Sequence, residues 1–154
     1  MSLAFTARSP SWRLPLVAGT AALVLQTFIF DRWFGLLDEG YILAIADDIN
    51  RGKVLYRDIY IDAPFPGAFY LLAGWFRLIG PSIWASRLLV VAAFTILVIC
   101  VTRIASVLLP RAGALAVVVV LLCYRVWAFP HWQVYNYSPM AAAALTAAVT
   151  VVLT

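Results

Sequence analysis

The stretch LLVVAAFTILVICVTRIASVLL, Leu88–Leu109, is apolar along almost its whole length. A helix needs about 20 such residues to cross the hydrocarbon core of a bilayer. The single charged residue of the stretch, Arg103, has a stem long enough to carry its guanidinium to the membrane surface. The stretch therefore predicts a transmembrane helix.

Further apolar runs lie on both sides of this helix. The chain has 154 residues, of which 65% are hydrophobic and 12% charged, a composition that a soluble domain cannot bury. We expect one domain, 1–154, with an all-α fold: a polytopic transmembrane bundle with spans at about 14–34, 88–109, 114–130 and 140–154. The last run is shorter than a full span, and this predicts the N-terminal portion of a longer protein.

Charge around the first apolar run predicts the orientation of the chain. Arg8 and Arg13 precede this run, and positive charge before a first span predicts that the N-terminus lies in the cytoplasm. We expect a multi-pass protein of the inner (plasma) membrane. The loop 35–63 is then extracytoplasmic. Segment 64–80 is apolar nearly all round but short and contains Arg77, so it is either a short span or a helix embedded in the membrane surface.

The acidic residues are confined to one part of the chain. All seven lie between Asp31 and Asp62, together with four basic residues, which gives this window a net charge of 4 − 7 = −3. The rest of the chain has seven arginines and no acid. These arginines flank apolar runs, as in membrane proteins. Despite the basic pI of about 9.4, no basic run or zinc spacing indicates a nucleic-acid partner.

Residues Asp38 to Gly52 have the pattern of a short amphipathic helix. Asp38 is a candidate N-cap, and Gly52 is placed to end the helix at C′. The apolar residues recur at helical spacing on one face: Ile42, Ile45, Ala46 and Ile49. We expect this helix to lie on the membrane surface. A solvated acidic face at Asp47 and Asp48 explains those carboxylates without any function.

Asp38 and Glu39 follow the first span directly, where the chain leaves the membrane. A carboxylate partly shielded by Phe34, Leu36 and Leu37 can have a raised pKa and act as a general base. The alternative is structural, with Asp38 as a helix cap only. Likewise, Asp58 and Asp62 can simply pair with neighbouring basic residues, which contributes little at a surface.

These motifs, in order, resemble the N-terminal part of GT-C superfamily glycosyltransferases, in the branch of protein O-mannosyltransferases and the lipid A aminoarabinose transferase. The matching features are Asp38-Glu39 after the first span, the amphipathic helix ending at Gly52, Tyr56-Arg57-Asp58, the proline-containing start of 64–80, and Gly-x-Ser-x-x-x-x-Arg-Leu from Gly80 to Leu88. In this family the second external loop faces the same side as the first, which favours a surface-embedded helix at 64–80.

The resemblance implies roles for particular residues. Asp38 matches the catalytic base, and Glu39 adjoins it as the second catalytic candidate. Asp62 falls where some relatives place a metal-binding carboxylate, which allows a divalent metal ion as a cofactor. Relatives follow that acid with a lysine that contacts the lipid phosphate; the residue here is Ala63, so Arg57 is the substitute. The candidates for substrate binding are Tyr56, Arg57, Asp58, Arg125, Asn136 and Tyr137.

Two of these assignments have plain alternatives. Arg125 either reaches a lipid phosphate or extends its side chain to the membrane surface. Asn136 and Tyr137 either bond a sugar or belong to an interfacial loop, and that loop lacks the second acid that relatives carry there. The missing acid weakens the case for a metal site with two carboxylates.

The function implied by the resemblance is transfer of a sugar from a polyprenyl-phosphate donor to an extracytoplasmic acceptor, which is a lipid, a glycan or a protein. No glycine-rich nucleotide loop is present in the sequence, which agrees with a lipid-linked donor. The second hypothesis is a non-catalytic membrane scaffold or accessory subunit that binds lipid or partner helices.

Overall fold

The computed structural model describes residues 11–32, 38–61, 66–129 and 134–153, although the side chain of Asp38 lies outside this description. The described chain is all helical and has no strand. Its helices are α1 (Arg13–Thr27), α2 (Asp38–Asn50), α3 (Gly67–Ile79), α4 (Ile83–Leu108), α5 (Arg111–Trp127) and α6 (Tyr137–Leu153). The expected all-α fold is confirmed, and every predicted apolar run contains a helix.

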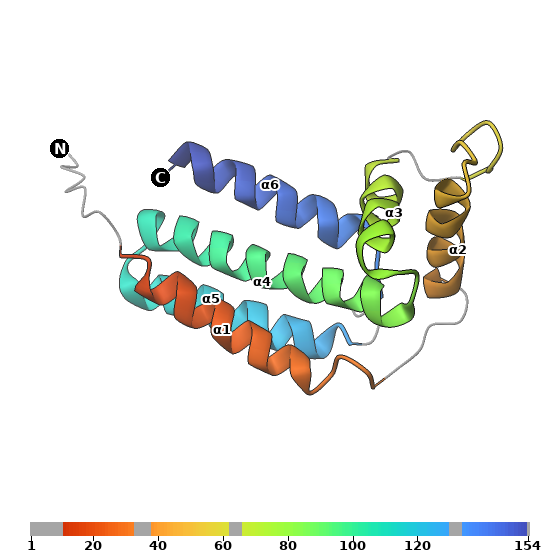
Figure 1. Cartoon of the computed structure of the whole chain (residues 1–154). Helices are drawn as coiled ribbons and strands as arrows, with labels where there is room; N and C mark the ends of the chain where they lie inside the picture. Colours follow the sequence, from red (N-terminus) through yellow and green to blue (C-terminus); the bar gives the residue numbers. More distant parts are fainter. Residues whose placement is uncertain (1–10, 33–37, 62–65, 130–133, 154) are drawn as a thin grey trace.

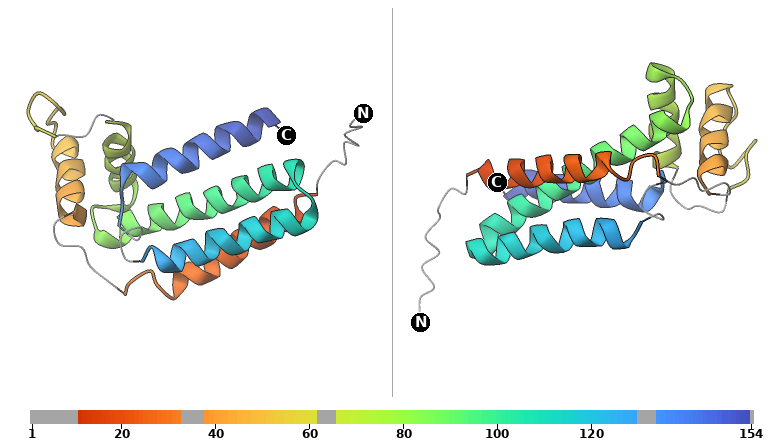
Figure 2. Two further views of the ribbon diagram at one scale, coloured as in Figure 1. Left: turned by 180° about the vertical axis from the view of Figure 1, so that it is seen from behind. Right: turned by 90° about the horizontal axis from the view of Figure 1, so that it is seen from below.

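Helix α4 is the centre of the fold and contacts all five other helices. Helices α1, α5 and α6 run alongside it, as Figures 1 and 2 show. Helices α1 and α5 also touch each other, whereas α6 touches neither of them and packs on α4 by itself. We call α1, α4, α5 and α6 the bundle.

Helices α2 and α3 lie across the end of the bundle where α4 begins (Figure 1). We call these two helices and the loop Arg51–Ile61 the cap. Helix α3 packs on α4 and α6, and α2 packs mainly on α3. Helix α3 lies across the end of the bundle rather than alongside it (Figure 1), and the choice between a short span and a surface-embedded helix for 64–80 stays a prediction.

Local signals set the ends of the cap helices. Gly52 has φ +92°, and the N–H groups of Gly52 and Lys53 donate to the carbonyls of Ile49 and Asp48. This is the Schellman arrangement that ends many helices, so the predicted role of Gly52 is confirmed. After α3, Gly80 with φ +87° turns the chain. Ser82 then caps α4, because its side chain accepts a hydrogen bond from the Ala85 N–H at 3.1 Å.

The apolar face predicted for α2 exists, but its partner is protein. Ile45, Ala46 and Ile49 are buried, and Ile42 packs beside them. They pack with the buried residues of α3, which are Phe69, Leu72, Ala73 and Phe76. The apolar face of α2 is therefore covered by α3 rather than open to lipid, and the expectation that the helix lies at the membrane surface stays a prediction.

Small residues let α1 approach α4 closely. Ala18, Gly19 and Ala22 lie on the buried face of α1, and the two alanines share a buried cluster with Phe94 and Val98 of α4. A Cβ built on Gly19 would lie 2.4 Å from the Cγ1 of Ile99. Small residues at such positions are characteristic of helix pairs in membranes, where association depends on close packing.

The lengths of the bundle helices differ from the predicted spans. Within the described residues, α4 is the one helix long and apolar enough to cross a bilayer by length and composition. Helix α1 ends at Thr27, before the predicted end of the span at 34, and continues as turns to Asp31. Helix α6 has 17 residues and begins at Tyr137, earlier than expected.

We predict that Gly19→Leu lowers the stability of the bundle by about 1–3 kcal/mol, because the added side chain must displace Ile99. Thermal unfolding of the purified protein in detergent measures this change. Gly74→Ala is the matched control, since a Cβ at Gly74 meets no atom within 4 Å. Equal stability of the two variants would contradict the close approach of α1 and α4.

Candidate functional site

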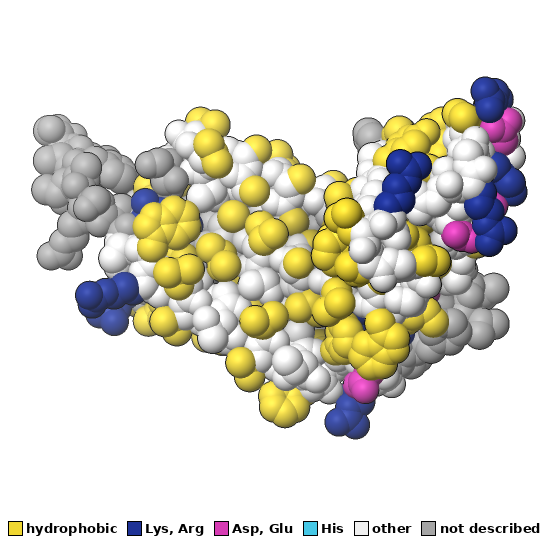
Figure 3. All heavy atoms as spheres, in the orientation of Figure 1, with side chains coloured by type: hydrophobic (Ala, Val, Ile, Leu, Met, Phe, Trp, Pro, Cys, Tyr) yellow, Lys and Arg dark blue, Asp and Glu magenta, His cyan; other side chains and the backbone are white. Residues whose placement is uncertain are grey.

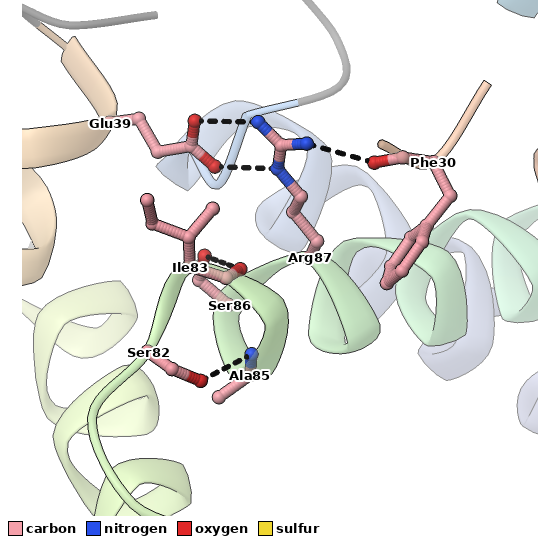
Figure 4. A network of polar contacts seen from close by, with 7 residues as sticks. All are labelled: Phe30, Glu39, Ser82, Ile83, Ala85, Ser86 and Arg87. Atoms are coloured by element: carbon pink, nitrogen blue, oxygen red, sulfur yellow. Dashed lines mark hydrogen bonds and ion pairs between the residues drawn. The ribbon is translucent and has the colours of Figure 1, made fainter. Parts of the chain in front are cut away.

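A buried ion pair joins the cap to the bundle. The Nε and Nη2 atoms of Arg87 donate to the two carboxylate oxygens of Glu39, each at 3.0 Å (Figure 4). The remaining Nη1 donates to the carbonyl oxygen of Phe30 at 3.0 Å. Glu39 is fully buried and Arg87 is 5% exposed. One guanidinium thus holds the start of α2, the first turns of α4 and the turn after α1.

A buried ion pair is stable only when its hydrogen-bond geometry is close to ideal. Two charges removed from water lose several kcal/mol of solvation each, and only well-placed hydrogen bonds offset that loss. The paired, parallel arrangement here satisfies both oxygens of the acid and uses the planar fork of the arginine. The position of the first turn of α2 relative to the bundle is therefore narrowly defined.

This pair changes the interpretation of Glu39. The sequence predicts Glu39 as a catalytic carboxylate beside Asp38, but both of its oxygens accept hydrogen bonds from Arg87 inside the protein. It is placed to anchor α2 rather than to take a proton from a substrate. Asp38 is the first residue of α2, so its backbone lies next to the anchored Glu39 at the junction of cap and bundle.

A second polar network lies one to two turns further along α4. The amide of Gln26 donates to the Val91 carbonyl at 3.3 Å and to the Thr95 hydroxyl at 3.2 Å. Its Oε1 accepts a hydrogen bond from Nη2 of Arg125 at 3.3 Å. The Arg125 guanidinium stacks 4.9 Å above the Phe94 ring and is 2% exposed. The structure therefore supports neither alternative for Arg125. Its side chain is buried in the protein, so it does not extend to the surface and is not open to a phosphate.

Tyr56, Arg57 and Asp58 form an exposed turn at the other end of α2. The Asp58 carboxylate accepts a hydrogen bond from the Val54 N–H at 2.9 Å and pairs with Arg57 at 2.8 Å. The hydrogen bond from Arg57, followed by that from Val54, lowers the pKa of Asp58 to about 2. The same contact raises the pKa of Arg57. The turn is further closed by Tyr56, whose φ is +65°.

The turn follows the end of α2 that is opposite to Asp38. Helix α2 has 13 residues, so its two ends are separated by about 20 Å, although the loop runs back far enough for the Tyr41 hydroxyl to donate to the Tyr60 carbonyl at 3.4 Å. Arg57 is paired with its own neighbour, and its sequence-predicted role beside a base at Asp38 has no support in the geometry. Asp47 and Asp48, the predicted solvated face, make ion pairs with Arg51 and Lys53 at 2.6 and 2.9 Å.

The remaining candidates lie around the start of α6. The side-chain Oδ1 of Asn136 accepts a hydrogen bond from the Ser138 N–H at 3.4 Å, as in a helix cap, and Tyr137 is exposed. Tyr135, which is not among the predicted site residues, is fully buried and donates to the Ala68 carbonyl at 2.7 Å, and this bond joins the segment before α6 to α3. Burial raises the pKa of its hydroxyl.

The predicted metal site can be compared with the described residues only. Among them, no group of three or more His, Cys, Asp or Glu side chains is placed to hold an ion. Asp62, the predicted metal ligand, lies outside the described residues, as does the side chain of Asp38.

The most informative residue at the junction, Arg87, was part of the family-like motif but had no assigned partner. An arginine at the start of a long apolar helix needs an anion or water. The sequence offered five nearby acids between positions 38 and 58, and nothing in the spacing selected Glu39 among them.

Comparison of the chain with models of known protein families, with curated proteins and with solved structures found no match.

We predict that Arg87→Gln destabilises the protein by about 3–5 kcal/mol, because it leaves the buried Glu39 carboxylate without its cation. Thermal unfolding in detergent measures the loss. The double variant Glu39→Met with Arg87→Met should lose less than the sum of the single changes, since no buried charge remains.

Arg51→Gln is the control, because it removes a surface ion pair with Asp47 and should cost no more than about 1 kcal/mol. If Arg87→Gln and Arg51→Gln were equally stable, the ion pair with Glu39 would not hold the cap.

Proposed function

We propose that this chain is the N-terminal membrane portion of a GT-C-like glycosyltransferase, which transfers a sugar from a polyprenyl-phosphate donor to an extracytoplasmic acceptor. The observation that carries the proposal is the buried Glu39–Arg87 pair, which fixes the first turn of α2, and with it Asp38, at the junction between cap and bundle. The family resemblance of Asp38-Glu39 supplies the chemistry.

The membrane placement is supported by the distribution of side chains. On the face shown in Figure 3, hydrophobic side chains cover the middle of the bundle, and charged side chains gather towards the two ends. Large apolar residues are highly exposed along the bundle, among them Val17, Val120 and Val152 at 66%, 64% and 84%. An exposed apolar belt between charged ends suits a bundle that crosses a bilayer. The cap then lies at the water–lipid boundary.

The orientation is proposed from charge. Segment 31–87, which contains the cap, has six basic and seven acidic residues, a net charge of 6 − 7 = −1. At the opposite end, Arg13 and Arg111 begin α1 and α5, and Arg103 lies 4.7 Å from the Trp12 ring. The first helix usually dominates orientation; Arg8 precedes it in the sequence and Arg13 is its first residue. We therefore place the cap outside and the opposite end in the cytoplasm.

In the proposed reaction, Asp38 acts as the general base. It takes the proton of the acceptor hydroxyl while the hydroxyl oxygen bonds to the anomeric carbon, and the bond from that carbon to the phosphate oxygen breaks. The lipid phosphate leaves with the bonding electrons, and the anomeric centre inverts. Glu39 and Arg87 are positioning residues, because they hold α2 and do not touch the substrate.

Neither predicted arginine is open to the departing phosphate. Arg125 is 2% exposed and bonded to Gln26 inside the bundle, and Arg57 is paired with Asp58. In this proposal a divalent metal ion held by Asp62 offsets the charge on the phosphate.

We predict that Tyr60→Cys, in a variant with Cys100 and Cys123 replaced by alanine, reacts with a membrane-impermeant maleimide added to intact cells. Tyr60 is 87% exposed on the cap. Arg111→Cys, at the opposite end of the bundle, should react only after the membrane is opened. The reverse labelling pattern would overturn the orientation and, with it, an external active site.

We predict that Asp38→Asn in the full-length protein lowers sugar transfer at least about 100-fold, as expected for loss of a general base. Membranes are supplied with synthetic polyprenyl-phosphate hexoses and pentoses, and release of polyprenyl phosphate is measured. The variant should still insert and unfold at the same temperature as the unchanged protein.

Asp47→Asn is the matched control, because Asp47 lies on the same helix and makes a surface ion pair with Arg51. It should retain transfer within about twofold. A scaffold or accessory subunit, the second hypothesis from the sequence, would show no transfer to lose, and Asp38→Asn would leave its membrane assembly unchanged.

A further inference from the structure

The cap has an open hollow at the end of α2 that is distant from Asp38. It lies between the C-terminal end of α2 and the exposed side of α3, and none of the predicted site residues contributes to it. Its lining residues are Ile49, Gly52, Lys53, Val54, Tyr70, Ala73, Gly74 and Arg77. Most of these are apolar or glycine, and the two charged side chains are both cations.

Arg77 is the stronger of the two cations. It lies in the last turn of α3 and donates through Nε to the side-chain Oδ1 of Asn50 at 2.8 Å. The Asn50 amide in turn donates to the Ala73 carbonyl at 3.0 Å. Asn50 is neutral, so it orients the guanidinium without neutralising it. Within the described residues Arg77 makes no ion pair, and its positive charge faces the hollow uncompensated.

Lys53 stands on the opposite wall with its charge partly offset. Its ammonium lies 2.9 Å from the Asp48 carboxylate, yet about half of its side chain remains exposed. A second anion can therefore reach it from the hollow. An anionic group placed between the two walls would face one uncompensated cation and one partly compensated cation.

The glycines of the lining leave room for a ligand. A Cβ built on Gly52 or on Gly74 would meet no atom within 4 Å. Gly52 is required by its positive φ at the end of α2, but Gly74 is in mid-helix, where alanine would be more stable. The open wall at Gly74 therefore has no local structural explanation.

The hollow lies beside apolar surface that suits a lipid. Tyr70 and Leu71 of α3 are 47% and 50% exposed, and an aromatic residue with a hydroxyl is typical of the membrane interface. A free anion such as inorganic phosphate would not contact these apolar side chains. A phospholipid would place its phosphate between the cations and its upper acyl chain along α3.

We propose that this hollow binds the phosphate headgroup of an anionic phospholipid, with Arg77 and Lys53 as the charged contacts. The inference rests on the membrane placement in the proposed function but concerns a different site, about 20 Å from Asp38 along α2. Its role would be to set the depth and tilt of the cap at the membrane surface.

The test uses the full chain in nanodiscs of phosphatidylcholine with or without phosphatidylglycerol, and native mass spectrometry measures the bound lipid. We expect preferential retention of phosphatidylglycerol, reduced about fivefold by Arg77→Gln and further by adding Lys53→Gln. Arg51→Gln, which removes a cap cation outside the hollow, should leave retention unchanged. Gly74→Leu fills the hollow without changing charge and should also reduce retention.

Each outcome decides the inference. Retention unaffected by both Arg77→Gln and Gly74→Leu would overturn it, as would an equal loss with Arg51→Gln or full competition by inorganic phosphate. The measurement needs no sugar. If the protein binds phosphatidylglycerol through Arg77 but transfers no sugar, this inference stands and the proposed function is wrong. If it transfers sugar but does not bind phosphatidylglycerol through Arg77, the proposed function stands and this inference is wrong.

Discussion

The arrangement of this protein depends on one buried guanidinium. Arg87 is in the second turn of α4, the helix that touches every other described helix, and it reaches the start of α2 and the turn after α1 at the same time. A buried carboxylate and a buried guanidinium can be tolerated together only when the geometry is close to ideal. The turn after α1 and the start of α2, which residues 31–37 separate in the sequence, are thus held at one place.

The packing of α1 on α4 has two features that are characteristic of helix pairs in membranes. Where lipid is as apolar as the side chains, helices gain from close backbone approach and from polar bonds between them. Helix α1 uses both: Gly19 admits the side chain of Ile99, and Gln26 bonds to α4 and to Arg125. The cap follows a different rule. Its two helices bury an ordinary apolar core between them, like a small water-soluble unit placed on the end of the bundle.

This division suits the proposed chemistry. A bundle that crosses the bilayer can hold a cap at a defined depth, and a cap with its own core can present a carboxylate to both water and lipid. The Glu39–Arg87 pair then has a positioning role, since it defines where Asp38 emerges without taking part in bond making. The hollow at the other end of α2 is far enough away to bind a lipid independently of the reaction.

The sequence by itself determined the elements of this protein. Helical periodicity, the positive-φ glycine at position 52 and the lengths of the apolar runs located the helices, the end of α2 and its apolar face, because these depend on neighbouring residues. The partners were decided only by the tertiary structure. It covered the face of α2 with α3, paired Glu39 with Arg87 rather than leaving it as a base, and separated Arg57 from Asp38. Ion pairs and apolar contacts between distant segments depend on how helices are placed in space, and the sequence held several acids of equal merit for one buried arginine.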